Sequence, residues 1–257
     1  LMMENKKFKY KIENKRYHTW NYYLRDKFGT KVFKVSINAG FTCPNIDGSI
    51  SYGGCAYCSK DGSGDFAGNP RDNLVKQFKD IKEMMEKKWP QAKYIGYFQA
   101  FTNTYAPLEV LKDKYETILD QDGVVGLSIS TRPDCIDDDI LDYLAQLNTR
   151  TNLWVELGLQ TVHDQTSNII NRGHGLDVFV DCVNRLRSRE IEVVAHVING
   201  LPGETYDLMM ETIRRVSHMD IQGVKIHLLH VIKGTPMVNI LNKGELKLLS
   251  KEEYVDL

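Results

Sequence analysis

The sequence lacks the features that mark several classes of protein. It contains no apolar run of about eighteen residues, so it predicts no transmembrane helix, and its first residues, LMMENK, lack the apolar core of a secretory signal peptide. Its 7 prolines and 19 glycines among 257 residues are ordinary numbers, which excludes a collagen-like or disordered chain. A chain of this length buries about 70–75% of its unfolded surface and needs no disulfide bonds. We therefore expect a folded protein of the reducing cytoplasm, without a membrane partner.

Positive charge is concentrated at the start of the chain. The formal net charge is −1, but residues 1–34 carry ten Lys or Arg and three Asp or Glu, a net charge of +7. Aromatic residues are interspersed with these basic residues: Phe8, Tyr10, Tyr17, Trp20, Tyr22, Tyr23 and Phe28. Basic side chains neutralise phosphates and aromatic rings stack on exposed bases, so residues 1–31 are interpreted as an RNA-binding extension. A solvated extension with a few rings packed against the body of the protein is an equal alternative.

Cysteine is scarce, with 5 residues, and three of them lie close together in the sequence. Cys43, Cys55 and Cys58 follow the spacing C-x11-C-x2-C. The segment around them is rich in glycine and contains Pro44 and Asn45, which is typical of a loop that wraps around a compact object. Residues 32–37 alternate like a strand. The cysteines therefore follow a strand, which in a parallel α/β barrel puts them on the catalytic face.

Three kinds of site compete for these cysteines. A disulfide is disfavoured in a cytosolic chain with an odd number of cysteines. A structural zinc site needs four ligands, and this loop offers three cysteines and no histidine. A [4Fe–4S] cluster usually has four cysteine ligands, and three would leave one iron open for a substrate or cofactor. The spacing alone leaves zinc and the cluster open, and we interpret the isolated Cys135 and Cys182 as buried apolar residues.

Strand and helix patterns alternate after the cysteine loop. Apolar strands are predicted over 32–37, 94–98, 124–130, 152–158, 191–198 and 223–229, and amphipathic helices over 73–88, 108–119, 137–147, 177–189 and 205–219. Continuous apolar strands separated by helices are typical of a parallel sheet. The predicted fold class is therefore α/β, a partial (βα)6 TIM-like barrel with parallel strands, in one domain over residues 32–257. Residues 250–257 begin another helix, so we expect this domain to be cut short at its C-terminus.

Polar residues gather where the predicted strands end. They are Gln99, Thr102 and Asn103 after the second strand, Ser130 at the end of the third, Glu156 and Gln160 on either side of the end of the fourth, Asn199 after the fifth, and His227 and His230 around the end of the sixth. Ligands of parallel α/β sheets bind at the carboxyl ends of the strands. These residues therefore predict a single pocket.

In its cysteine loop and its strand-end residues, the sequence resembles the radical S-adenosylmethionine (SAM) superfamily. Within that superfamily it is most similar in type to the bacterial YhcC/YtqA proteins. The resemblance covers nearly the whole chain and is carried by CPNIDG (43–48), GCAYC (54–58), GSGDFAG (62–68), YFQAFTNTYAP (97–107) and HVINGLPGE (196–204). The chain is more distantly similar to the Elongator catalytic subunit, which acts on the tRNA wobble uridine. That resemblance is carried by TRPD (131–134), ELGLQ (156–160) and NRGH (171–174).

The resemblance implies a role for each site residue. Cys43, Cys55 and Cys58 would ligate three irons of a [4Fe–4S] cluster, and SAM would chelate the fourth iron. Further contacts to SAM would come from Tyr57 and Ile198 at the adenine, Glu156 and Gln160 at the ribose, and Arg172 at the carboxylate. Gln99, Thr102 and Asn103 occupy the region after the second strand where the superfamily has a Gly-Gly-Glu stretch, and Ser130, at the end of the third strand, would be a further cofactor-binding residue. The sequence departs from the common superfamily pattern in its eleven-residue first cysteine gap and in His196, where a glycine is usual.

The same resemblance implies an activity. The enzyme would reductively cleave SAM at the cluster to a 5′-deoxyadenosyl radical, which takes a hydrogen atom from a substrate. Because this cleavage needs the low end of the range of cluster potentials, an external electron donor such as flavodoxin or ferredoxin is implied. The Elongator-like motifs and the basic extension predict that the substrate is a tRNA base, at the wobble uridine side chain. A small metabolite or porphyrin-like substrate is the alternative, and a zinc-stabilised binding barrel without catalysis is a third hypothesis.

Overall fold

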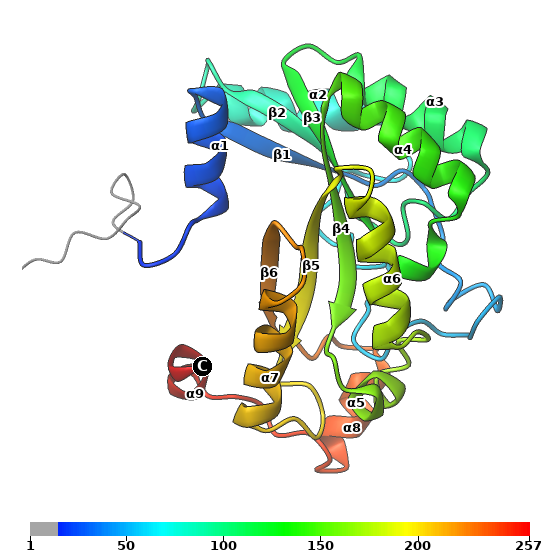
Figure 1. Ribbon diagram of the computed structural model, residues 1–257, viewed down its shortest axis with the longest axis vertical. Coiled ribbons are helices and arrows are strands. Elements are labelled where there is room, and N and C mark those ends of the chain that lie inside the picture. Colours follow the sequence, from blue (N-terminus) through cyan, green and yellow to red (C-terminus); the bar gives the residue numbers. More distant parts are fainter. Residues whose placement is uncertain (1–14) are drawn as a thin grey trace, which may run out of the picture.

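The computed structural model describes residues 15–257, which are built around one parallel sheet curled into a half-barrel (Figure 1). The six strands lie side by side in chain order, and each neighbouring pair is parallel. Their bounds are β1 Val32–Ile37, β2 Lys93–Phe98, β3 Val124–Thr131, β4 Asn152–Gln160, β5 Glu192–Asn199 and β6 Gly223–Leu228. The predicted partial barrel is confirmed, with β1 and β6 as its edge strands.

Helices connect the strands and cover the convex face of the sheet (Figure 1). The five predicted helices are present as α2 Leu74–Glu86, α3 Leu108–Leu119, α4 Asp138–Arg150, α6 Leu176–Arg187 and α7 Tyr206–Ser217. The structure adds the short elements η1 Pro133–Cys135, α5 Asp164–Ile169 and α8 Pro236–Asn242, and the helix predicted within residues 250–257 is present as α9 Lys251–Asp256. The sequence pattern missed η1, α5 and α8 because elements this short show too few turns for a helical period.

The main hydrophobic core lies between the sheet and this helical layer. Apolar side chains of alternate strand residues, such as Leu127 and Val155, are fully buried there together with Leu144 of α4. Gly96 on β2 allows α3 to pack closely, because a Cβ atom at this position would lie 2.3 Å from the side chain of Ile118. Helix and sheet faces therefore interlock over the convex side, which leaves the concave side for a site.

The concave side of the sheet is layered along the strands. At the amino ends of the strands the inner side chains are apolar, with Val32, Ile95 and Trp154 in one buried cluster. Two residues further along each strand the inner side chains are polar: Lys34, Tyr97, Ser128, Glu156, His196 and Lys225. This order follows from the two-residue period of strands, which returns every second side chain to the same face. The polar layer forms the base on which a pocket at the carboxyl ends can rest.

One helix, α1 (Trp20–Phe28), lies in the segment that the sequence analysis treats as an extension. Thr19 caps its start by accepting a hydrogen bond from the backbone of Tyr22. Leu24 is 1% exposed, and the ring of Trp20 packs edge-on against Trp154, with 5.2 Å between ring centroids. The aromatic residues of α1 thus close the apolar end of the half-barrel, as the alternative interpretation expects. Residues 1–14, with the four basic residues Lys6, Lys7, Lys9 and Lys11 of the predicted arm, lie outside the described part of the chain.

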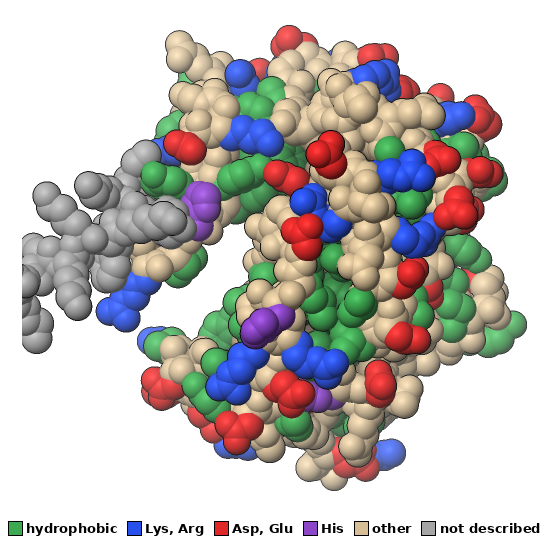
Figure 2. All heavy atoms as spheres, viewed as in Figure 1, with side chains coloured by type: hydrophobic (Ala, Val, Ile, Leu, Met, Phe, Trp, Pro, Cys, Tyr) green, Lys and Arg blue, Asp and Glu red, His purple; other side chains and the backbone are tan. Residues whose placement is uncertain are grey.

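The half-barrel is open on one side. Figure 2 shows a hollow in the surface between the region of α1 and the region of β6 and α9. The edge strands β1 and β6 do not pair with each other.

Within residues 15–257, no helix is both long enough and apolar enough to cross a bilayer.

Candidate functional site

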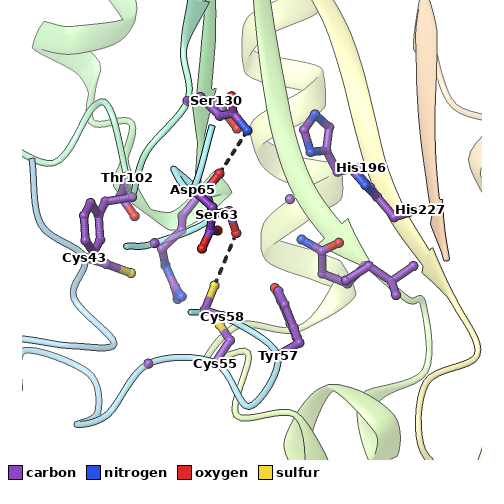
Figure 3. A pocket seen from close by; sticks show the side chains of 18 of the residues that line it. Cys43, Cys55, Tyr57, Cys58, Ser63, Asp65, Thr102, Ser130, His196 and His227 are labelled. Carbon is purple, nitrogen blue, oxygen red and sulfur yellow. Dashed lines mark hydrogen bonds between the residues drawn. The ribbon is translucent and has the colours of Figure 1, made fainter. Parts of the chain in front are cut away.

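A cavity of about 360 Å³ lies at the carboxyl ends of the strands, between the sheet and the loop of residues 38–73 (Figure 3). Most of the predicted site residues line it: Cys43, Cys55, Tyr57, Cys58, Gln99, Thr102, Ser130, Gln160, Arg172 and Ile198. These residues come from the cysteine loop, from β3, β4 and β5, and from the turns after β2 and α5. The fold thus brings together side chains that are far apart in the sequence.

The cysteine loop is held against the body of the protein by hydrogen bonds to backbone carbonyl groups. The Ala56 backbone N–H donates to the carbonyl oxygen of Ile170 at 2.9 Å, and the Asn45 side-chain amide donates to the carbonyl oxygens of Asn171 and Arg172. Asn45 is completely buried. The loop that carries the cysteines is therefore anchored to the segment after β4, although it has little regular structure of its own.

The three cysteines of the loop are free thiols that line the same cavity. The pKa of Cys55 is well below its usual value because Cys58 donates a hydrogen bond to it and because Arg172 and Arg132 place positive charge nearby, which together outweigh its burial. The Arg172 guanidinium lies 3.8 Å from the Cys55 sulfur, and the Asn45 amide nitrogen lies 3.4 Å from it. This environment favours the thiolate form, which is the form that binds metals.

Arg172 is a buried cation fixed by its own hydrogen bonds. Its guanidinium donates twice to the carbonyl oxygen of Gly158, at 2.6 and 3.2 Å. Residue 158 must lack a side chain, since a Cβ atom there would lie 2.6 Å from the Arg172 guanidinium. Arg132 in turn donates to the carbonyl oxygen of Arg172 at 2.8 Å and pairs with Asp134. The guanidinium is thus oriented toward the cavity before any ligand binds.

Gln160 shows an unpaired polar atom in the same cavity. Its side-chain oxygen is buried and has no hydrogen-bond partner within residues 15–257, and its backbone adopts a φ of +72°, which few residues other than glycine accept. A buried acceptor without a partner costs free energy unless a ligand supplies the donor. Gln160 is therefore arranged to accept a hydrogen bond from a ligand.

Two of the residues predicted to contact SAM do not line the cavity, and neither does Asn199, which the sequence predicts for the same pocket. Asn103 is fully buried, and its side chain donates to the carbonyl oxygen of Ser130 at 2.8 Å. Glu156 is also fully buried, in the polar layer below, where both carboxylate oxygens already have partners in Lys34, Ser128 and His196. Their roles in the structure are to support the cavity from behind and from beneath.

The cavity also contains residues that sequence reasoning did not single out. Ser63, Asp65 and Phe66 come from the cysteine loop, and Lys225 and Tyr97 come from the polar layer. Only the closure of the sheet brings residues of β2 and β6 to one cavity. The two-residue strand period was the available signal, because Lys225 and His227 fall on the same face of β6.

The donor set at this site is compatible with an iron–sulfur cluster. Over residues 15–257, no three Cys, His, Asp or Glu side chains converge on one point as a mononuclear ion requires. A cluster does not require its ligands to converge on one point, since each of three thiolates binds a different iron at a different corner. Three cysteines facing an open cavity, with a buried guanidinium beside one sulfur, are suited to such a group.

The chain matches two known sequence families. The profile of the radical SAM superfamily matches residues 50–216, and that of the radical SAM C-terminal domain matches residues 221–257. The chain is 59% identical to the uncharacterized protein YtqA of Bacillus subtilis over 256 residues, which is 100% of this chain and 80% of that protein. It is 37% identical to protein YhcC of Escherichia coli over 90% of this chain and 74% of that protein.

More distant matches include a tRNA uridine(34) acetyltransferase and two solved structures. A tRNA uridine(34) acetyltransferase of Methanocaldococcus infernus is 28% identical over 137 residues, which is 52% of this chain and 25% of that protein. Among solved structures, the Elp3 protein of the same archaeon superimposes with a TM-score of 0.63 at 19% identity, over 86% of this chain and 51% of that one. Coproporphyrinogen III oxidase of E. coli superimposes with a TM-score of 0.56 at 16% identity, over 88% of this chain and 50% of that one. At these identities the superpositions show the shared half-barrel fold.

Proposed function

Because the chain belongs to the radical SAM superfamily, we propose that Cys43, Cys55 and Cys58 bind the [4Fe–4S] cluster that the superfamily implies, with SAM in the cavity above them. The observation that carries this assignment is the meeting of three free cysteines, from positions twelve and three residues apart, at one open cavity. When bound, the cluster supplies the electron for reductive cleavage of SAM, which generates the reagent that takes a hydrogen atom from a substrate.

The chain's own residues would position SAM. Arg172, a fixed guanidinium with its remaining donor capacity toward the cavity, is suited to a carboxylate. The unpaired oxygen of Gln160 is suited to a ribose hydroxyl. Tyr57 and Ile198 offer apolar surface to an adenine ring, and Gln99, Thr102 and Ser130 line the wall that remains for the SAM amine.

We propose a tRNA base, at the wobble uridine, as the substrate. Support comes from the match to tRNA uridine(34) acetyltransferases over half of the chain and from the +7 charge of residues 1–34. The basic residues of that segment would neutralise phosphates of the RNA. Mass spectrometry of tRNA nucleosides, from cells with and without the gene, tests this directly. An unchanged nucleoside profile together with a changed porphyrin or small-metabolite profile would favour the alternative substrate class.

Loss of one cluster ligand should abolish SAM cleavage and leave the fold intact. We expect anaerobically reconstituted wild-type protein to hold about four irons and four sulfides, and Cys58→Ala to hold fewer irons and to cleave no SAM under reductant. Cys182→Ala, a buried cysteine on the convex side of the sheet, is the matched control and should keep both. Stoichiometric zinc without sulfide in wild-type protein, or retained SAM cleavage in Cys58→Ala, would contradict the assignment.

A further inference from the structure

The polar layer beneath the cavity holds more positive than negative charge. Glu156 of β4 supplies its one carboxylate, and this carboxylate is fully buried. Two ammonium groups approach it from opposite edges of the sheet, Lys34 from β1 and Lys225 from β6. His196 of β5 occupies the second carboxylate oxygen at 2.6 Å. Among the described residues, one of the two ammonium groups is therefore left without a carboxylate of its own.

Lys225 is that group. Lys34 forms a direct ion pair with Glu156, whereas the Lys225 nitrogen stays 4.0 Å from the carboxylate and donates instead to the Tyr97 hydroxyl at 3.1 Å. Burial and the nearby Glu156 charge raise the pKa of Tyr97, so this hydroxyl is neutral and cannot balance the ammonium charge. The Lys225 side chain is 38% exposed, and it lines the cavity.

A second donor stands beside Lys225 on the same face of the strand. His227 lies two residues further along β6, also lines the cavity, and has its ring centroid 5.4 Å from that of His196. Burial, with the neighbouring His196 and Lys225, lowers the pKa of His227 to about 4, so the ring is a neutral hydrogen-bond donor at pH 7. Figure 3 shows His196 and His227 on the strand side of the cavity, opposite the loop that carries the cysteines.

The acidic residue that lines this cavity belongs to the other wall. Asp65 is part of the cysteine loop, and the Ser59 hydroxyl donates to its carboxylate at 3.0 Å. Arg172, the guanidinium assigned above to SAM, also lies with the cysteines, next to Cys55. The β6 side of the cavity therefore has its own, separate cation.

We propose that Lys225 and His227 form a subsite for an anionic group of the substrate, a phosphate or a carboxylate. The inference rests on the proposed function in one respect, namely that the substrate enters this cavity. A half-buried ammonium without a bonded carboxylate gains charge-assisted hydrogen bonds when an anion binds. The position of Lys225 on an edge strand, at the open side of the half-barrel, leaves room for a bulky substrate to reach it.

Equilibrium binding to reconstituted protein tests the subsite. Isothermal titration calorimetry would compare uridine 5′-monophosphate with uridine, and inorganic phosphate and acetate would serve as competitors. We expect wild-type protein to bind the nucleotide about tenfold more tightly than the nucleoside, since the phosphate adds charge-assisted hydrogen bonds. Competition by phosphate alone would identify a phosphate subsite, and competition by acetate alone a carboxylate subsite.

Substitutions at Lys225 and at a control lysine distinguish a specific anion subsite from a general effect of positive charge on binding. Lys225→Gln should remove most of the preference for the nucleotide over the nucleoside, or most of the competition by the anion. Lys225→Arg should keep this anion binding. Lys243→Gln, which changes an exposed lysine at the end of α8, should leave anion binding unchanged. Thermal melts show that each variant is folded. Absence of anion binding in wild-type protein, or unchanged binding in Lys225→Gln, would overturn the proposal. Cluster content and SAM cleavage decide the proposed function separately, because neither measurement depends on the anion.

Discussion

Glu156 balances positive charge on the concave side of the sheet. Burial by itself would raise the pKa of this carboxyl, but the charge of Lys34 and the hydrogen bond from His196 outweigh burial and hold it well below its usual value. The carboxylate is therefore ionised at neutral pH, and side chains of two other strands, β1 and β5, stabilise its charge. A buried charge whose partner is removed is strongly destabilising, whereas exposed pairs contribute little.

Glu156→Gln should destabilise the protein by about 3 kcal/mol, because it leaves Lys34 and Lys225 facing each other without a carboxylate. Urea denaturation measures the change. The matched control is Glu116→Gln, which breaks the exposed pair with Arg150 and should cost about 1 kcal/mol or less. Equal effects of the two variants would contradict the view that Glu156 balances the polar layer.

His174 should make the protein sensitive to acid. Burial and the nearby Arg172 lower its pKa to about 3, and its ring nitrogen Nε2 is buried with no hydrogen-bond partner among the residues that the structure describes. Since the unfolded chain binds a proton near pH 6.5 and the folded state does not, the stability from this group is complete above pH 6.5 and falls as the pH decreases toward 3. Urea denaturation at pH 7.5 and pH 5 should show a smaller difference in His174→Gln than in wild-type protein. His218→Gln, an exposed histidine at the end of α7, should show the wild-type difference.

At the scale of elements, α1 is part of the half-barrel rather than a free arm. Its residues Trp20 and Leu24 lie with Trp154 in the apolar cluster that closes the amino ends of the strands. Removal of residues 1–34 would therefore remove this helix and half of β1 as well as positive charge. A truncation that tests RNA binding has to end before the cap residue Thr19.

Leu24→Ala should cost about 2–5 kcal/mol, because it opens a cavity in a buried cluster. Thermal or urea unfolding would measure this loss. The neighbouring Asp26→Ala changes an exposed position of the same helix and should stay within about 0.5 kcal/mol of wild type. A small effect of Leu24→Ala would mean that α1 does not contribute to the stability of the half-barrel.

At the scale of the whole molecule, the charge distribution and the open side of the half-barrel determine how a large substrate could bind. Residues 1–34 carry +7, and the rest of the chain carries the compensating negative charge. Lys15 and Arg16, at the start of the described residues, have exposed side chains. If this segment contacts tRNA phosphates, binding must weaken as salt rises, because bound counterions are released on association.

Lys15→Gln/Arg16→Gln should reduce the slope of the logarithm of the tRNA binding constant against the logarithm of salt concentration by about one to two units, since each phosphate contact contributes about one. Filter binding over a range of salt concentrations measures the slope. Lys76→Gln/Lys79→Gln on α2 removes the same charge elsewhere and should leave the slope unchanged. Salt-independent binding by wild-type protein would exclude a phosphate-contacting extension.

The sequence by itself determined the fold class and the three cysteines at one site. Local patterns were enough, because the strands buried on both faces are continuous apolar runs and the helices keep one apolar side. The cysteine loop could be recognised because its glycines and its spacing lie within one segment.

Only the tertiary structure decided which strand-end residues face the cavity. Glu156 and Gln160 share β4, yet Glu156 is enclosed by Lys34 and His196 from other strands while Gln160 keeps a free oxygen in the cavity. It also decided that α1 closes one end of the half-barrel and that Lys225, in the described part of the chain, hydrogen-bonds to Tyr97 and to no carboxylate. These properties depend on distances between segments far apart in the chain, and no local pattern encodes such distances.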